Sequence, residues 1–176
     1  MKLLLYLILL TFNLNYLTAQ EIDLDDYNFI IKDSIIENNR VGNIKLCDSL
    51  KMDSLDFKNN WSDIKYKAQK ILSISTTNKS KVSSIFVVSP QFTLKEKIKV
   101  GMRIKDLIQL YPKLKIFRWH AGLYEHANLP DFPNIILDLK SDNGKELGFY
   151  KKKNITKKYR LDGEIIGIEL ISHNCY

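Results

Sequence analysis

Two histidines and a glutamate lie close together in a stretch of the chain that can be read as a metal site. Residues 119–131 read WHAGLYEHANLPD, and zinc takes imidazole nitrogen and carboxylate oxygen as ligands. The candidate ligands are His120, Glu125 and His126. The two histidines are six positions apart, which matches no helical metal motif, and Gly122 favours a loop. We therefore expect an irregular loop over packed aromatic residues, and we keep a metal-dependent enzyme as the alternative.

Three common sequence signatures of catalytic and phosphate-binding sites are not found in the chain. It contains no G-x-S-x-G, H-E-x-x-H or G-x-x-x-x-G-K pattern. Asp25 and Asp26 are neighbouring carboxylates, but the two groups of an acid–base pair are usually distant in sequence and cannot be recognised from one chain. We therefore expect no enzyme, no catalytic residue and no cofactor.

The second half of the chain carries a dense cluster of positive charge. The whole chain has a formal net charge of +7, while residues 21–60 are acidic overall. Residues 151–160 contain six bases and no acid: Lys151, Lys152, Lys153, Lys157, Lys158 and Arg160. Arg118 and Trp119 add a further base beside an aromatic ring.

This basic cluster has a structural and a functional interpretation. A row of solvated lysines protects the edge of a sheet from pairing with another sheet. The same residues can dock an acidic protein, an anionic polysaccharide or a lipid headgroup layer. Aromatic residues beside bases also suit nucleic-acid stacking, but the export signal described next argues against a nucleic-acid partner.

The N-terminus has the layout of a secretory signal peptide. Lys2 precedes an apolar run of about ten residues, and Ala19 provides a small residue for cleavage. The run is short for a membrane span, which needs about 20 apolar residues, although an uncleaved anchor helix is the alternative. We predict that residues 1–19 are removed, that no transmembrane segment remains, and that the protein is periplasmic or secreted.

Cys47 and Cys175 are the two cysteines of the chain. In an oxidising compartment they can form one disulfide that closes almost the whole mature chain. The alternatives are a buried unpaired Cys47 and a frayed C-terminal Cys175.

An internal repeat organises the chain. Residues 44–51 align without gaps to residues 98–105, and residues 82–89 align to residues 165–172. The two matches occur in the same order, which favours a duplication over chance similarity. The second copy is longer by about 29 residues. We therefore divide the mature chain into a first unit at 20–90 and a second unit at 91–176, packed as one compact domain or as two modules.

Each unit is predicted to contain a strand, a short helix and a meander. Ile104, Leu107, Ile108 and Tyr111 have helical spacing, and strands outnumber helices elsewhere. Asn-Gly at 143–144 and Asp-Gly at 162–163 predict two-residue hairpins. The expected strands are at 27–31, 64–75, 82–89, 114–119, 134–139, 145–150, 157–161 and 164–172. The predicted fold class is α+β, an antiparallel sheet with short helices in two tandem α/β units of unequal length.

The segment KIKVGMRIKDLIQLYP at 97–112 resembles a recurrent segment of small exported bacterial proteins, in which a Gly-Met or Gly-Asp pair starts a short helix. With the duplication, it resembles the fold of the β-lactamase inhibitor protein, which has two such units, and of small outer-membrane assembly lipoproteins with one. The first unit departs from this pattern because Cys47 aligns with Gly101, and the lipoprotein cysteine is absent. The Ala-Gln cleavage site and the Asn, Lys and Ile content resemble exported proteins of Bacteroidetes-type bacteria.

The resemblance implies a binding or inhibitory module, but a shared fold cannot identify the partner. We expect a non-catalytic exported binding protein, of inhibitor or immunity type, that docks a protein or an anionic envelope component. The alternatives are the metal-dependent enzyme and a structural envelope protein. The sequence does not specify an oligomeric state.

Overall fold

The structure is a computed structural model that describes residues 35–49, 61–66, 68–77, 81–95, 97–118, 124–150 and 154–172. Of these residues, 56% lie in strands or bridges and 6% lie in a helix. The expected α+β class with several short helices is therefore wrong, because the described chain is predominantly antiparallel β-sheet with one helix. The strand expected at 27–31 and the helix expected in the first unit lie outside the described residues.

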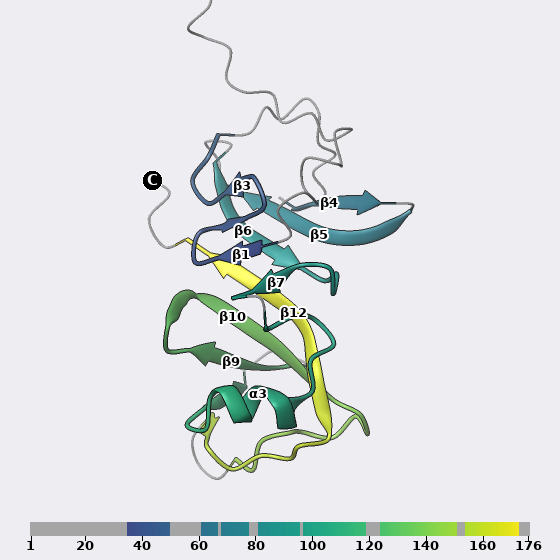
Figure 1. Cartoon of the computed structure of the whole chain (residues 1–176), viewed down its shortest axis with the longest axis vertical. Coiled ribbons are helices and arrows are strands. Elements are labelled where there is room, and N and C mark those ends of the chain that lie inside the picture. Colours follow the sequence, from purple (N-terminus) through teal and green to yellow (C-terminus); the bar gives the residue numbers. More distant parts are fainter. Residues whose placement is uncertain are drawn as a thin grey trace, which may run out of the picture.

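Among the described residues, eight antiparallel strands form one large sheet (Figure 1). Its strand order is β11-β8-β9-β10-β12-β6-β5-β4. The strands are β4 (Trp61–Tyr66), β5 (Gln69–Thr76), β6 (Val82–Val87), β8 (Ile116–Arg118), β9 (Glu125–Leu129), β10 (Phe132–Ser141), β11 (Ile155–Thr156) and β12 (Gly163–Ile171). Because β12 pairs with both β10 and β6, strands from the two predicted units form one continuous sheet.

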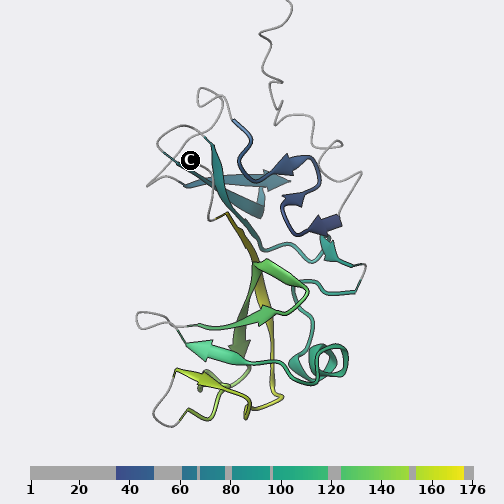
Figure 2. The same ribbon diagram turned by 90° about the vertical axis from the view of Figure 1, so that its left-hand side faces the viewer.

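A small sheet and the helix α3 (Ile104–Leu110) lie on one side of the large sheet (Figures 1 and 2). The small sheet has the order β3-β2-β1-β7. Its strands are β1 (Ile35–Glu37), β2 (Arg40–Val41), β3 (Ile44–Lys45) and β7 (Thr93–Leu94). The parallel pairing of β7 with β1 joins the second predicted unit to the first, so the units share both sheets. The division into units at residue 90 stays a prediction.

The helix α3 follows the apolar spacing of the sequence. Ile104 and Leu107 are fully buried, and Ile108 and Tyr111 pack against the core. The helix ends at Leu110, before a proline that disfavours helical geometry in the preceding residue. The prediction of this helix from its periodicity is confirmed.

The residues matched by the internal repeat make equivalent contacts. Cys47 and Gly101, which are aligned, both have left-handed backbone angles, with φ of 71° and 84°. The Cys47 N–H donates to the carbonyl of Val82 at 2.8 Å, and the Gly101 N–H donates to the carbonyl of Ile165, the residue aligned with Val82, at 2.7 Å. The reciprocal bonds also match: Val82 N–H donates to Asp48 O and Ile165 N–H to Met102 O, both at 2.9 Å.

The repeat extends into strands whose sequences show no clear similarity. In the meanders β4-β5-β6 and β9-β10-β12, the inner pairs β5-β6 and β10-β12 have the same pairing register, and each contains a bulge at the same point, after Ser75 and after Asp138. Where the meanders meet, Phe86 of β6 lies directly opposite Glu169 of β12, and these two residues are aligned in the repeat. Equivalent residues that face each other across antiparallel strands place a local two-fold axis between β6 and β12.

Three strand predictions need correction. The run predicted at 64–75 forms two strands, because the chain reverses near Ala68, which has a φ of 64°. The runs predicted at 145–150 and 157–161 are mostly irregular, and one isolated bridge joins Gly148 to Tyr159. The two-residue hairpins predicted at 143–144 and 162–163 are wrong as well, because Ser141 pairs directly with Gly163, and the strand described between them, β11, pairs with β8.

Candidate functional site

Glu125 and His126, two of the three candidate metal ligands, do not converge on one point. Glu125 and His126 are neighbours on β9, where successive side chains point to opposite faces of the sheet. Glu125 is buried, and its carboxylate accepts hydrogen bonds from the backbone N–H groups of Leu147 and Gly148 and from the Tyr150 hydroxyl (2.7 Å). His120 lies outside the described residues, and within those residues no group of three metal-binding side chains is found.

His126 lies on the opposite face and is held by two neighbours. Its Nδ1 is 2.7 Å from a carboxylate oxygen of Asp138, the residue directly opposite on β10. Its ring stacks on Phe117 of β8, with the ring centres 5.4 Å apart. One ring nitrogen and one face of the imidazole are therefore engaged in contacts within the sheet.

One short catalytic sequence pattern is present, but its two reactive side chains do not lie together in the structure. Ser62, Asp63, Ile64 and Lys65 fit S-x-x-K, a pattern in which the lysine must reach the serine. In β4 these residues alternate between buried and exposed, so Ser62 faces the core and Lys65 faces away from it. Because the serine and lysine lie on opposite faces, the lysine cannot activate the serine hydroxyl.

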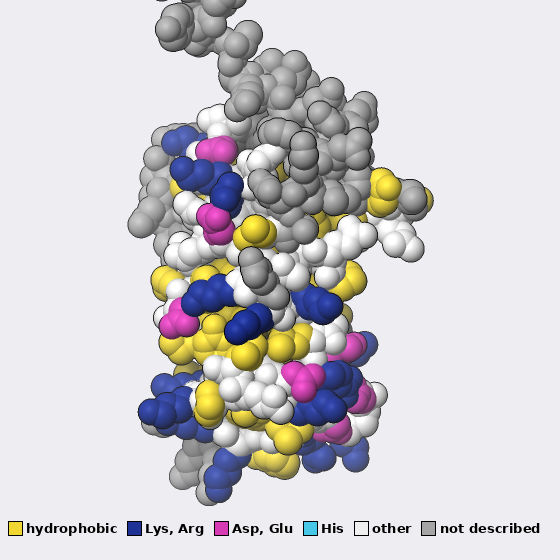
Figure 3. All heavy atoms as spheres, in the orientation of Figure 1, with side chains coloured by type: hydrophobic (Ala, Val, Ile, Leu, Met, Phe, Trp, Pro, Cys, Tyr) yellow, Lys and Arg dark blue, Asp and Glu magenta, His cyan; other side chains and the backbone are white. Residues whose placement is uncertain are grey.

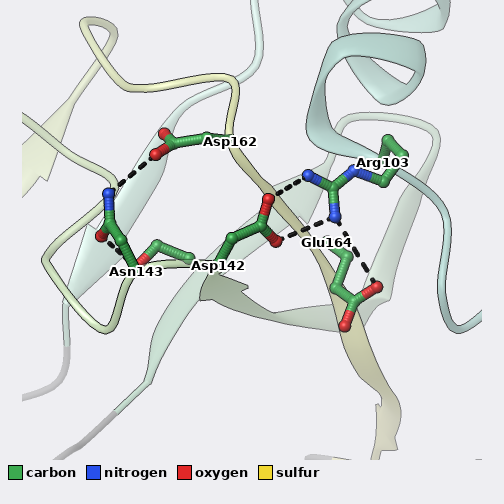
Figure 4. Close-up of polar contacts among 6 residues, drawn as sticks. Arg103, Asp142, Asn143, Asp162 and Glu164 are labelled. Carbon is green, nitrogen blue, oxygen red and sulfur yellow. Dashed lines mark hydrogen bonds and ion pairs between the residues drawn. The ribbon is translucent and has the colours of Figure 1, made fainter.

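Six of the predicted basic residues belong to the connection between β10 and β12 at 142–162, which contains the short strand β11 and which we call the basic loop. An ion-pair cluster closes its base (Figure 4). Arg103, just before α3, makes a bidentate contact with Asp142 and lies 3.9 Å from Glu164 of β12. The side chain of Asn143 donates to the carboxylate of Asp162 at 2.8 Å. The Arg103 guanidinium lowers the pKa of Asp142, so the Arg103–Asp142 ion pair stays charged well below neutral pH.

The described bases of the loop differ in their surroundings. Lys157 and Lys158 are exposed, while the Arg160 guanidinium lies 5.2 Å from the centre of the Phe149 ring. Arg118 pairs with Glu146 at 2.7 Å, and its neighbour Trp119 lies outside the described residues. Lys151, Lys152 and Lys153 also lie outside the described residues.

Beside this loop is a hollow of about 340 Å³. It lies between the loop base and the ends of β8, β9 and β10. Its walls include Arg118, Tyr124, Glu125, Lys145 and Glu146.

The second side of the large sheet, away from α3 and the small sheet, carries a different set of residues. We call it the open face, and it is on the left of Figure 2. A hollow of about 290 Å³ lies there across β4, β5, β6 and β12. It is lined by two aromatic rings, two carboxylates, a lysine and a serine: Trp61, Phe86, Asp63, Glu169, Lys70 and Ser73.

Charges within this hollow are unevenly compensated. Lys70 lies 2.9 Å from Asp63 and Ser73 donates to the same carboxylate at 2.7 Å, and these two bonds lower the pKa of Asp63. Burial raises the pKa of Glu169, a shift opposed by the hydrogen bond that the Ser84 hydroxyl donates at 2.8 Å. Glu169 is thus a carboxylate whose charge is destabilised by its surroundings and would be stabilised by an incoming cation.

The local two-fold axis relates positions on the open face whose side chains differ between the two meanders. The ring of Phe86 covers Gly167, and a Cβ atom at Gly167 would lie 2.4 Å from that ring. The carboxylate of Glu169 covers Ser84, which is the residue aligned with Gly167. The centre of the open face is therefore half aromatic and half acidic.

Sequence reasoning missed the open face. Trp61, Phe86, Asp138 and Glu169 were not predicted as site residues. Asp138 and Glu169 each interrupt an apolar strand, in ILDL and IELI, and a single acid in such a run is the signal that identifies the second face.

Cys47 is engaged in a disulfide, and its Sγ lies 3.2 Å from the Ser172 hydroxyl oxygen. The only other cysteine, Cys175, is three residues beyond Ser172 but lies outside the described residues. The Cys47–Cys175 pairing therefore stays a prediction. The helix in the described ranges is too short to cross a membrane.

Together these features define a protein of mainly antiparallel β-structure, built from a repeated three-strand meander. Ion pairs close the base of its basic loop, and its open face carries aromatic and acidic residues. No family model matches the chain, and a search of curated proteins finds no match. A search of solved structures finds the uncharacterised protein yfeY from Escherichia coli, with a TM-score of 0.46 and 10% sequence identity. The match covers 67% of this chain and 78% of that one.

Proposed function

We propose that the protein is a non-catalytic exported binding module whose open face holds a protein partner, as an inhibitor or immunity-type protein does. The observation that supports this role is the hollow that contains Trp61, Phe86 and Glu169. Trp61 is 37% exposed, and large aromatic side chains of this kind are enriched among the residues that dominate binding energy.

The chemistry of the hollow favours a basic side chain from the partner. A lysine or arginine is attracted to the faces of aromatic rings and to a carboxylate. Asp63 already has Lys70 as a counter-ion, whereas burial disfavours the charge on Glu169. A cation from the partner would stabilise that charge, so the complex gains an interaction that the free protein lacks.

The metal-dependent enzyme has no comparable support, since Glu125 and His126 lie on opposite faces of β9. Equilibrium dialysis against zinc tests it directly, and we expect no stoichiometric binding. A structural envelope protein is the other alternative. It would be abundant, and its deletion would weaken the cell surface without loss of a specific complex.

The test compares two exposed apolar residues on opposite sides of the molecule. The tagged protein is cross-linked in an envelope extract of its own bacterium at low salt, and the captured protein is identified. We expect Trp61→Ala to reduce capture at least tenfold, because a central tryptophan contributes on the order of 2 kcal/mol or more to an interface. Leu110→Ala, at the end of α3 and 40% exposed, should leave capture unchanged. Equal capture by both variants, or no captured protein, would contradict the proposal.

A further inference from the structure

The basic loop displays apolar side chains that the rest of the structure does not cover. Phe149, Ile155 and Leu161 are 53%, 59% and 54% exposed, and they are the three most exposed large hydrophobic side chains in the described part of the chain. None of them lines either of the two hollows described above. Exposed apolar residues concentrated in one loop indicate an interaction surface.

The acids of this loop already have partners, whereas its outer bases, where the structure describes them, form no ion pair with a described acid. Asp142 is paired with Arg103, Glu146 with Arg118, and Asp162 accepts from Asn143. For Lys157, Lys158 and Arg160, no ion pair with an acid is found among the described residues. The outer part of the loop is therefore positive, and Figure 3 shows basic side chains beside apolar surface at this lower end of the molecule.

Hydrogen bonds hold the loop in an ordered form that keeps these side chains on display. Phe149 N–H donates to Lys158 O and Arg160 N–H donates to Leu147 O, both at 2.8 Å. The Thr156 hydroxyl donates to Phe149 O at 3.1 Å. These bonds join residues 147–149 to residues 156–160, and Phe149, Ile155 and Leu161 each remain more than half exposed.

We propose that the basic loop docks onto the surface of an anionic lipid bilayer. Phe149, Ile155 and Leu161 enter the headgroup layer, while Lys157, Lys158 and Arg160 contact lipid phosphates. Apolar residues interspersed with bases are the combination that anionic membrane surfaces bind. A soft headgroup layer can accept separate protruding side chains, whereas a protein partner would need a matching pocket for each. This surface is distinct from the open face of the proposed function.

The test is flotation of the full chain with phosphatidylcholine vesicles that contain or lack phosphatidylglycerol. We expect binding only with phosphatidylglycerol, and weaker binding as salt rises, since salt screens exposed charges. The Lys157→Glu, Lys158→Glu double variant should bind at least tenfold more weakly. The Lys97→Glu, Lys99→Glu double variant makes the same change in net charge at two exposed lysines outside the loop, and it should bind within twofold of the wild type.

A second pair of variants tests the apolar part. Leu161→Ser should weaken vesicle binding several-fold, whereas Leu110→Ser should not. Every variant carries the same N-terminal residues, so any contribution of residues 1–19 cancels in the comparison, and circular dichroism checks that each variant is folded.

Three outcomes would overturn the inference: equal binding to vesicles without phosphatidylglycerol, equal loss in both lysine double variants, or retention by an acidic protein column with no vesicle binding. The Trp61→Ala variant should bind vesicles normally, so failure of this inference and failure of the proposed function can be distinguished.

Discussion

Glu125 anchors the first part of the basic loop, and its replacement by glutamine tests that role. The buried carboxylate accepts hydrogen bonds from two backbone N–H groups, of Leu147 and Gly148, and from the Tyr150 hydroxyl. The carboxylate also raises the pKa of Tyr150 further, beyond the effect of burial, because it favours the protonated phenol. A glutamine side chain has one acceptor oxygen and an NH₂ group, so at least one of these donors loses its partner.

The expected loss follows from the number of donors. A hydrogen bond to a charged group contributes about 1.5 to 3 kcal/mol, and a buried donor left without a partner costs about 1 to 3 kcal/mol. Glu125→Gln removes the charge from all three bonds and leaves one N–H unpaired. Part of this loss is offset because an amide is easier to bury than a carboxylate. We therefore expect the free energy of unfolding to fall by about 3 kcal/mol, measured by urea denaturation.

Two variants act as controls for this prediction. Tyr150→Phe removes one of the three bonds and should lower stability by about 1.5 kcal/mol. Glu146→Gln makes the same chemical change as Glu125→Gln at an exposed ion pair with Arg118, and it should cost less than about 1 kcal/mol. If Glu125→Gln were no more damaging than Glu146→Gln, or if zinc stabilised the wild type and not Glu125→Gln, our account of Glu125 as a structural anchor would be refuted.

Two further predictions concern the disulfide and the open face. Cys47→Ser should lower the free energy of unfolding by about 4 to 5 kcal/mol in the chain-entropy model, provided Cys175 is the partner. A linked Cys47–Cys175 peptide in a non-reduced digest checks the pairing. A wild type whose stability does not change with reductant would contradict the prediction. Because the pKa of Glu169 is raised in the folded state, its contribution to stability is greatest below its ordinary value of 4.5 and is lost as pH rises through the folded pKa. The Glu169→Gln variant should therefore gain stability relative to the wild type across that rise, and a difference that stays flat with pH would exclude this cause.

Local sequence patterns predicted the elements whose cause is local. The helix α3 follows from the spacing of Ile104, Leu107 and Ile108, and the strands β6 and β12 follow from short aliphatic runs. The alignment of the β6 run with the β12 run identified where each copy of the repeat ends. At the start of the repeat, Cys47 and Gly101 share an uncommon backbone conformation although the residues differ.

Long-range pairing could not be predicted from the same patterns. Asn-Gly at 143–144 and Asp-Gly at 162–163 do mark changes of chain direction, but a turn signal does not say which segments pair afterwards. Here Ser141 pairs with Gly163, and the two turn regions meet at one loop base through the Asn143–Asp162 hydrogen bond. The fold class was wrong for a related reason, since one periodic helix was extended to both units by analogy.

The candidate metal site was inferred from residues that are close together in the sequence, without regard to the secondary structure that they adopt. Residues 119–131 were interpreted as a loop, in which neighbouring side chains can converge. In the structure Glu125 and His126 belong to a strand, which sends their side chains to opposite faces. The same alternation produces two distinct results: Glu125 secures the basic loop, and His126 joins Asp138 on the open face.

The internal repeat separates the residues that build the fold from those that distinguish its two halves. On the covered face the paired positions of the two meanders are apolar in both copies: Leu72 and Ile135, Ile74 and Leu137, Ile85 and Ile168, Val87 and Leu170. On the open face the equivalent positions differ, with Trp61 against His126 and Phe86 against Glu169. A symmetric scaffold with an asymmetric face can present one partner with an aromatic and an acidic half side by side. Exchanging Phe86 and Glu169 would keep the composition of the face and reverse that order, so it should abolish capture of the partner while leaving vesicle binding by the basic loop intact.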